Sequence, residues 1–354
     1  MSKVKVLIVD DSAYSRQAIR KAIDQEADIE VVGISTDGID AMAKTIMFKP
    51  DLITLDLEMP GMDGFTFLRW LMKKKPTPVI VVSSYSDSKT VFKALELGAA
   101  DFIAKPQKIA RLEIQKMQAD LLNKVRIIQD LRMDRLSKSL ELMEEDKSKR
   151  KFLETTGKGI EAVAIGSSTG GPNALKIIMT RLPADFQASI VISQHMPKGF
   201  TASFAERLNE VSDLHIKEAK EGDVIERGTA FLCPGGSHML FRKRAGKVVA
   251  IIKESKRSDK YIPSIDIMMS SAAEVFGKKT MGVLLTGMGN DGVSGMLEIK
   301  RKGGYTIAES EDSAVIFGMP SEVIKMGAAG RILPISEIPD EIIKLTKIKD
   351  QGEN

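Results

Sequence analysis

The chain has almost no cysteine, and it lacks the apolar segments typical of secreted or membrane proteins. Cys233 is the single cysteine among 354 residues, so a scaffold held by internal disulfides is excluded. Three histidines accompany it, and there is no Cys-x-x-Cys motif that would form a zinc framework. No run approaches the roughly 20 apolar residues that cross a bilayer, and no apolar signal core precedes the first strand pattern. We expect a cytoplasmic protein in which Cys233 is a small core residue.

A strong excess of charge is also missing. The sequence has 52 lysines and arginines against 48 aspartates and glutamates, for a net charge of +4. A balance this close does not indicate nucleic acid as a partner. The hydrophobic content of 43% and charged content of 28% are those of a globular protein, and the length accommodates two domains with a core each.

One long segment lacks proline and nearly lacks glycine. Between Gln107 and Lys158 there is no proline, and the first glycine is Gly157. Leucine and valine recur there at helical spacing, so we predict that the last helix of the first domain continues into a charged connector. The predicted organisation is a first domain at residues 1–122, a charged helical linker at 123–158, a second domain at 159–348 and a tail at 349–354.

Short apolar runs alternate with amphipathic stretches in both domains. In the first domain these runs predict a flavodoxin-like, five-stranded parallel sheet with helices on both faces. The predicted strands of the first domain are residues 4–9, 29–34, 52–55, 79–82 and 102–104. Those of the second domain are residues 160–166, 188–195, 229–233, 248–252, 280–286, 305–308 and 332–334.

Acidic side chains follow two strands of the first domain. Asp10 and Asp11 come after the first strand, and Asp56 follows the third. Because the carboxyl ends of parallel strands meet at one edge, these three carboxylates repel one another unless a hard divalent cation is bound. The sequence therefore predicts a Mg²⁺ site that leaves Asp56 able to attack a phosphoryl group.

The other strand ends of this domain suit a phosphorylation switch. Lys105 would neutralise the charge of a transferred phosphate, and the hydroxyl of Ser83 would donate a hydrogen bond to it. Phe102, three residues before the lysine, could change its packing when the loop moves. Each residue alone is also common as a turn former or a helix cap. Together they predict control by phosphorylation.

A glycine-rich turn opens the second domain. Residues 166–171 read Gly-Ser-Ser-Thr-Gly-Gly, and Pro172 follows in a position that suits the first turn of a helix. The Gly-x-Ser-x-Gly frame places Ser168 at the tip, as in hydrolases that expose a nucleophilic hydroxyl. A phosphate or dinucleotide cradle has a similar glycine pattern, but no Lys-Ser/Thr pair follows as in a P-loop. Serine hydrolysis is the first hypothesis for this turn.

A serine nucleophile needs a base and an orienting acid. His195 closes the next strand, so in a parallel sheet it would emerge beside Ser168, and His238 is the runner-up. His215 lies in an alternating segment typical of a half-buried strand. Asp291, at the end of another apolar strand, is the best acid, although a helix cap would also explain it. The order Ser, His, Asp differs from that of α/β-hydrolases and argues against that fold. The βα alternation predicts a Rossmann-like, doubly wound domain instead.

The first domain closely resembles the response-regulator receiver domain. The similar segments are residues 7–12, 55–64, 82–84 and the Lys105-Pro106 pair. The resemblance implies that Asp56 accepts phosphate from a sensor histidine kinase, with Asp10 and Asp11 at the Mg²⁺ site. It also implies that Glu58 offers its backbone carbonyl to the metal.

The second domain resembles the chemotaxis protein-glutamate methylesterase family, CheB. Five motifs carry the resemblance, at residues 165–171, 193–200, 234–238, 285–292 and 317–320. With the receiver included, the resemblance covers nearly the whole chain. It implies hydrolysis of glutamate γ-methyl esters on methyl-accepting chemotaxis receptors, with release of methanol and often deamidation of receptor glutamines. No cofactor is implied for this step.

Carried over by motif, Ser168 is the nucleophile, His195 the base and Asp291 its orienting acid. Thr169 and the backbone of Met288 then line the oxyanion region. The resemblance also implies that the receiver covers Ser168 until Asp56 is phosphorylated, and that the protein works at receptor membranes without inserting into them.

The chain departs from the family in three places, and two other functions stay open. The pair Ser167-Ser168 stands where the family has a small residue and a serine, and both the Gly-x-Ser-x-Gly frame and the resemblance select Ser168. Ile262 precedes Pro263-Ser264 where the family commonly has arginine, and the connector is charged instead of proline-rich. One alternative is the same esterase acting on a sensory protein outside chemotaxis. The other is a phosphorylation-controlled protein that binds a nucleotide or a partner without catalysis.

Overall fold

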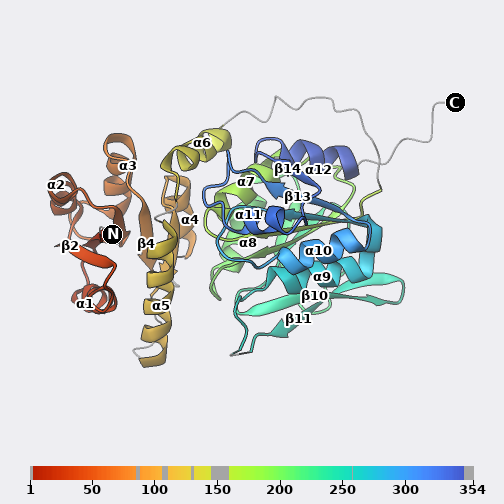
Figure 1. Ribbon diagram of the computed structural model, residues 1–354, viewed down its shortest axis with the longest axis horizontal. Coiled ribbons are helices and arrows are strands. Elements are labelled where there is room, and N and C mark those ends of the chain that lie inside the picture. The colour runs from red at the N-terminus through yellow and green to blue at the C-terminus, as the bar shows by residue number, and fades with distance from the viewer. Residues whose placement is uncertain are drawn as a thin grey trace. The chain divides into compact units, whose positions relative to one another are not determined.

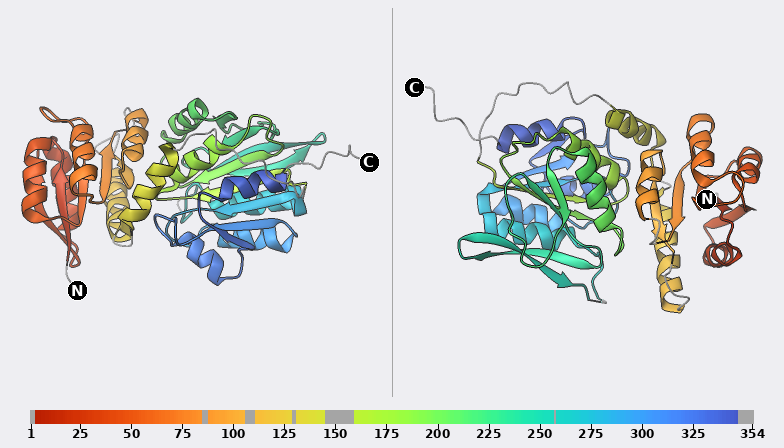
Figure 2. Two further views of the ribbon diagram at one scale, coloured as in Figure 1. Left: turned by 90° about the horizontal axis from the view of Figure 1, so that it is seen from above. Right: turned by 180° about the vertical axis from the view of Figure 1, so that it is seen from behind.

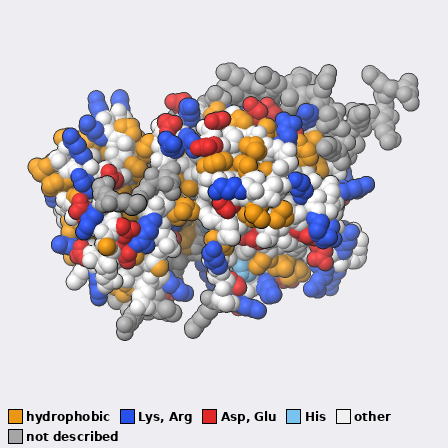
Figure 3. All heavy atoms as spheres, viewed as in Figure 1, with side chains coloured by type: hydrophobic (Ala, Val, Ile, Leu, Met, Phe, Trp, Pro, Cys, Tyr) orange, Lys and Arg blue, Asp and Glu red, His pale blue; other side chains and the backbone are white. Residues whose placement is uncertain are grey.

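The computed structural model describes residues 3–84, 88–105, 111–128, 131–144, 159–256 and 258–346. The chain divides into two compact units, Met1–Leu140 and Glu141–Asn354 (Figure 1). Each unit is built around its own parallel sheet. Lysines, arginines and acidic residues are interspersed over the face shown in Figure 3.

The first unit is a five-stranded parallel sheet in the order β2-β1-β3-β4-β5. This order is the flavodoxin-like one, so the predicted fold class is confirmed. The strands are β1 (Val4–Val9), β2 (Ile29–Ser35), β3 (Leu52–Leu55), β4 (Val79–Ser83) and β5 (Asp101–Ala104). The helices are α1 (Ala13–Ile23), α2 (Gly38–Phe48), α3 (Gly64–Lys74), α4 (Ser88–Glu96) and α5 (Arg111–Ile128).

Polar caps start the first three helices of this unit. The side chains of Ser12, Asp37 and Asp63 accept hydrogen bonds from backbone N–H groups in the first turns of α1, α2 and α3. Such caps satisfy donors that have no partner within the helix. Because β1 and β3 are neighbours, the residues that follow them meet at the carboxyl edge of the sheet.

The second unit has a seven-stranded parallel sheet in the order β14-β13-β12-β6-β7-β9-β8, together with an antiparallel hairpin, β10-β11. The sheet strands are β6 (Ala162–Ser167), β7 (Ser189–Gln194), β8 (His215–Glu218), β9 (Thr229–Leu232), β12 (Thr280–Leu284), β13 (Tyr305–Glu309) and β14 (Arg331–Leu333). The hairpin strands are β10 (Ser237–Arg244) and β11 (Lys247–Glu254). The helices are α7 (Gly171–Arg181), α8 (Thr201–Val211), α9 (Ile265–Phe276), α10 (Val293–Arg301), α11 (Met319–Lys325) and α12 (Ile338–Thr346), with a short 3₁₀ turn, η3 (Gly277–Lys279).

The strand order reverses at the centre of this sheet. Strand β6 lies between β7 and β12. After β6 the chain continues to β7 on one side of it, and after β12 it continues to β13, which lies farther out on the other side. Right-handed crossovers in opposite directions place helices on opposite faces, and helices cover both faces in Figure 2. A crevice forms at the carboxyl ends of strands where the order reverses. The loops after β6, β7 and β12 therefore meet there, as the doubly wound prediction requires.

The charged segment after the first sheet is helical where it is described. The predicted boundary at residue 122 falls inside α5, and the next described helix is α6 (Met133–Glu144). Leu121, Val125 and Ile128 are buried along one face of α5, as their spacing predicts. Residues 145–158 and 347–354 lie outside the described residues. The division into four parts stays a prediction.

The hairpin strand β10 was not predicted, because its outer half is the exposed, charged sequence Arg-Lys-Arg.

Cys233 is fully buried, as expected, and burial raises the pKa of its thiol to about 12. None of the described helices combines the length and apolar character needed to span a bilayer.

Candidate active site

The glycines of the turn around Ser168 are required by conformation and by close packing. Gly170 has a φ of 78° immediately before α7. A Cβ atom on Gly166 would lie 2.3 Å from Cγ2 of Ile265, and one on Gly171 would lie 2.1 Å from Oε1 of Gln194. The turn is therefore pressed against the start of α9 and the end of β7. Ser168 stays partly exposed at its tip.

The two adjacent serines have different surroundings. Ser167 is fully buried, and its hydroxyl donates a 2.6 Å hydrogen bond to Oε1 of Gln194. Nε2 of Gln194 donates to the backbone carbonyls of Ser168, at 2.9 Å, and His195, at 3.1 Å. Gln194 therefore fixes the backbones of the serine and histidine turns together, and Ser168 presents the accessible hydroxyl.

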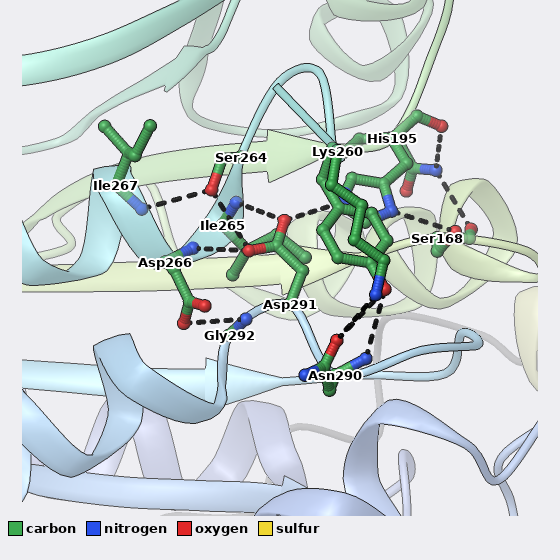
Figure 4. A network of polar contacts seen from close by, with 12 residues as sticks. Ser168, His195, Lys260, Ser264, Ile265, Asp266, Ile267, Asn290, Asp291 and Gly292 are labelled. Atoms are coloured by element: carbon green, nitrogen blue, oxygen red, sulfur yellow. Dashed lines mark hydrogen bonds and ion pairs between the residues drawn. The ribbon is translucent and has the colours of Figure 1, made fainter. Parts of the chain in front are cut away.

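Ser168, His195 and Asp291 form a continuous relay (Figure 4). The distance between Nδ1 of His195 and Oγ of Ser168 is 3.2 Å, and that between Nε2 of His195 and Oδ2 of Asp291 is 2.8 Å. An ionised carboxylate only accepts hydrogen bonds, so Nε2 carries the proton toward Asp291. Nδ1 is then the basic nitrogen, and it faces the serine hydroxyl.

Asp291 is held as an anion by several donors. Its side chain is 1% exposed, and it accepts hydrogen bonds from the backbone N–H of Ile265 at 2.7 Å and of Asp266 at 2.9 Å. The hydroxyl of Ser264 donates at 3.1 Å. These groups form the positive N-terminus of α9. Burial acts to raise the pKa of Asp291, but His195 and these backbone donors outweigh it and lower the pKa below its usual value.

The backbone of Asp266 donates to Asp291, and the side chain of Asp266 in turn accepts hydrogen bonds from the residues that follow Asp291. Its Oδ1 atom accepts hydrogen bonds from the backbone N–H of Gly292 at 2.9 Å and of Gly295 at 2.7 Å, at the start of α10. Burial, with the nearby charge of Asp291, raises the pKa of Asp266. Asp291 thus accepts hydrogen bonds from the start of α9, and Asp266 accepts them from the start of α10. These paired contacts fix Asp291 within hydrogen-bond distance of His195.

The two residues predicted for the oxyanion region have different environments. Thr169 is buried, and its carbonyl accepts a 3.0 Å hydrogen bond from the hydroxyl of Thr286. Met288 is 40% exposed. Its neighbour Gly287 passes so close that a Cβ atom there would lie 2.6 Å from Cβ of Ser168. Both residues border Ser168, and their role toward an oxyanion stays a prediction.

The other two histidines lie elsewhere. His238 is 2% exposed; its Nε2 atom is 2.9 Å from Oδ2 of Asp259, and its Nδ1 atom accepts a 3.1 Å hydrogen bond from the backbone of Ser264. It supports the segment before α9 and makes no described contact with Ser168. His215 begins strand β8, as the alternation predicted, but its side chain is exposed.

Three carboxylates meet at the sheet edge of the first unit. Ligand atoms of Asp10, Asp11 and Asp56 all lie within 4.8 Å of one another, so the donors fit a hard divalent cation. Nζ of Lys105 lies 2.5 Å from Oδ2 of Asp56 and 3.2 Å from Oδ2 of Asp10. The backbone N–H of Glu58 donates to Asp56 at 3.3 Å. The three carboxylates lie together at the sheet edge, as their positions at the strand ends predict, and their role as a Mg²⁺ site stays a prediction.

Burial dominates the electrostatics of this sheet edge. It raises the pKa of Asp56 despite the neighbouring Lys105, and the charge of Asp10 raises it further. Burial opposes the charge on Lys105 too, but Asp10 and Asp56 together raise the pKa of its ammonium group. Ser83 is buried, and its carbonyl accepts a 2.7 Å hydrogen bond from the backbone N–H of Lys105. Phe102 is also buried, and its ring packs edge-on against Phe92.

Gln194 and Asp266 were not predicted as site residues. Gln194 stands next to His195 inside a motif, and Asp266 lies in the first turn of a helix, where an acidic residue is ordinary. Only the packing shows that one joins the turns of Ser168 and His195 and that the other caps the helix that follows Asp291.

Comparison with known proteins identifies both units. Residues 163–342, about half of the chain, match the family model CheB methylesterase, and residues 6–116 match the response regulator receiver domain. The chain belongs to the CheB methylesterase family. The receiver match shows that this member carries a response-regulator domain as well.

Relatives of this CheB family member match it over nearly their full length. The "Protein-glutamate methylesterase/protein-glutamine glutaminase 3" of Geobacter sulfurreducens is 46% identical over 97% of this chain and 98% of its own. The similarly named protein of Pyrococcus horikoshii is 41% identical over 99% and 96%. Among solved structures, the crystal structure of the Thermotoga maritima CheB methylesterase catalytic domain is 42% identical, with a TM-score of 0.51, and covers 54% of this chain and 99% of that one.

Proposed function

We propose that this protein is a phosphorylation-activated protein-glutamate methylesterase that hydrolyses glutamate γ-methyl esters on chemotaxis receptors and deamidates receptor glutamines. It would act in the cytoplasm, at the receptor membrane but without inserting into it. The observation that carries the proposal is the continuous Ser168–His195–Asp291 relay at the switch point of the sheet. The names of the full-length relatives support the substrate class.

The first half-reaction transfers the glutamyl group to Ser168. Nδ1 of His195 takes the hydroxyl proton as Oγ attacks the ester carbonyl, and Asp291 stabilises the imidazolium that forms. The turn of Thr169 and the loop of Met288 flank the place where the oxyanion develops, so their backbone N–H groups are the proposed donors. The ester C–O bond then breaks, and His195 returns the proton to the departing methanol.

The second half-reaction frees the enzyme. Water attacks the acyl-enzyme with His195 again as the base, and the receptor glutamate and the Ser168 hydroxyl are released. A receptor glutamine follows the same route, except that ammonia leaves in place of methanol. The residues of the relay supply all of the proton transfers in this scheme.

The receiver unit provides the proposed control. Asp56 accepts phosphate from a sensor histidine kinase, and Asp10, Asp11 and the backbone carbonyl of Glu58 would hold Mg²⁺, which neutralises phosphate charge during transfer. Lys105 moves from the carboxylates to the phosphate, and Ser83 donates its hydroxyl to it. The new contacts change the packing of Phe102, and phosphorylation raises the fraction of chains in which Ser168 is accessible to a receptor.

Methanol release from methyl-labelled receptor membranes tests this function. We expect the protein to release volatile label, and to release more when a small phosphodonor and Mg²⁺ are present. Membranes from cells that lack chemotaxis receptors, labelled in the same way, are the control. Release from both kinds of membrane alike would mean that the substrate is another sensory protein, and absence of release from either would contradict the esterase.

A further inference from the structure

One aromatic residue outside the relay lies flat against the catalytic histidine. The rings of Tyr261 and His195 are stacked, with centroids 5.2 Å apart and an angle of 4° between their planes. Tyr261 belongs to the segment between β11 and α9, a region that none of the predicted site residues occupies. The His195 side chain keeps only 15% of its surface exposed.

The loop that carries Asp291 holds Tyr261 in place. The tyrosine hydroxyl donates a 3.1 Å hydrogen bond to Oδ1 of Asn290, and the backbone N–H of Asn290 lies 3.4 Å from the same hydroxyl. A Cβ atom on Gly289 would lie 2.5 Å from that oxygen, so only glycine leaves room for it. Nζ of Lys260 lies 4.8 Å from the centroid of the tyrosine ring, within cation–π range.

The stack constrains a motion that the hydrogen bonds of the relay resist weakly. Ser168 lies within hydrogen-bond distance of one ring nitrogen of His195, and Asp291 lies within hydrogen-bond distance of the other. Tilting of the imidazole about the axis through these two contacts lengthens neither of them, so the two bonds alone hold the plane of the ring weakly, although their angles change with the tilt. A parallel ring against one face opposes this tilt, as offset aromatic pairs do in protein cores.

We propose that Tyr261 is a positioning residue for His195, holding the imidazole in the plane that joins Ser168 to Asp291. The proposal rests on the esterase function proposed above, because it assigns His195 the role of base. The hydroxyl of Tyr261 sets the position of the ring through Asn290, and the ring sets the plane of His195. Substrate contact is not part of this role.

Truncation of the ring tests the proposal against a conservative change. We expect Tyr261→Leu to lower kcat for methanol release about tenfold with KM nearly unchanged, because the catalytic geometry is disturbed and substrate binding is not. Tyr261→Phe keeps the stack and loses only the hydroxyl, so we expect a fall of about threefold. Tyr305→Leu is the matched control. The Tyr305 hydroxyl forms a hydrogen bond with Glu341, and Tyr305 begins strand β13, so it lies at the amino ends of the strands, away from the carboxyl ends that carry the relay.

A second readout separates this proposal from the choice of substrate. The rate at which a fluorophosphonate probe labels Ser168 depends on the relay and not on a receptor. We expect Tyr261→Leu to slow labelling to the same extent as kcat. If the wild-type protein releases no methanol but labelling still slows in Tyr261→Leu, the esterase proposal fails and the positioning role survives. Unchanged labelling in folded Tyr261→Leu would overturn the positioning role, as would a rise in KM alone.

The anchor through Asn290 supplies an independent variant on an exposed side chain. Asn290→Ala removes the side-chain acceptor of the tyrosine hydroxyl, together with the 3.4 Å contact of Lys260 Nζ, and leaves the ring. We therefore expect about the same loss of kcat as in Tyr261→Phe. Combining the two changes should then add little, because both remove one interaction. Fully additive losses, with the variants folded as judged by circular dichroism, would contradict the anchor.

Discussion

Two buried aspartates at the carboxyl edges of the two sheets have opposite electrostatic surroundings. Burial raises the pKa of Asp56, and the neighbouring carboxylate of Asp10 adds to the effect. Asp291 is also buried, but His195 and the N–H groups of α9 lower its pKa. A carboxylate saturated with donors is a permanent anion that orients its neighbour. Asp56 has fewer donors, Lys105 on one oxygen and the Glu58 N–H on the other. The same type of side chain therefore suits two different proposed chemistries.

The largest expected effect comes from removing the charge of Asp291. Asp291→Asn should lower kcat about 10⁴-fold, because an amide neither stabilises the imidazolium nor enforces the tautomer with the proton on Nε2. The measurement is methanol release from labelled receptor membranes. Asp185→Asn, a change at an exposed aspartate of the same unit, is the control and should leave the rate unchanged. Activity of Asp291→Asn within a factor of about ten of the wild type would contradict the relay.

Removing the charge of Asp56 should act on control and not on the chemistry. Asp56→Asn should give the same methanol release with and without acetyl phosphate and Mg²⁺, because the amide cannot accept the phosphoryl group. Asp24→Asn, at the exposed end of α1, should keep the response of the wild type. An equal response in Asp56→Asn would show that phosphate is not accepted there.

The same two substitutions should change stability in opposite directions near pH 7. The raised pKa of Asp56 means that its ionisation costs folding free energy as pH rises through that pKa, so Asp56→Asn should stabilise the first unit and raise its urea midpoint. Trp70, the single tryptophan, lies in α3 and reports unfolding of this unit in urea through its fluorescence. A lower urea midpoint for Asp56→Asn would contradict the crowding of the carboxylates.

Asp291 should show the reverse dependence on pH. Its lowered pKa contributes stability that is present above about pH 4, the ordinary value, and is lost as pH falls through the lower folded value. Asp291→Asn should therefore destabilise the second unit at pH 7 by about 1 to 3 kcal/mol, because the N–H groups of α9 lose a charged acceptor. Circular dichroism during urea unfolding at pH 7 and pH 3 checks both parts, and the difference from the wild type should shrink at the lower pH.

The sequence predicted the parts of both sites that stand at strand ends. The positions of Asp10, Asp56, Ser168, His195 and Asp291 follow from apolar runs and the rule that parallel strands end at one edge. Their convergence in space depends on strand order, which places β6 between β7 and β12. The spacing of the runs does not predict this order, and the motif resemblance assigned the three residues to one site without it.

The supporting residues could not be predicted because their roles depend on tertiary packing. Asp266 caps a helix that begins more than twenty residues later, and Tyr261 stacks on a histidine from a distant strand. His238 illustrates the opposite outcome, since a strand-end histidine beside a glycine turn proved to be a buried partner of Asp259. Local patterns indicate which side chains reach the crevice, and packing decides which of them meet.

The most direct test of the account compares the two adjacent serines. Methanol release from labelled receptor membranes is measured for Ser168→Ala and Ser167→Ala, each with acetyl phosphate and Mg²⁺. The account predicts release at background level for Ser168→Ala. For Ser167→Ala, which removes only the buried hydrogen bond to Gln194, it predicts a rate within about threefold of the wild type and a loss of about 1 kcal/mol in stability. Release by Ser168→Ala at the wild-type rate would contradict the serine mechanism.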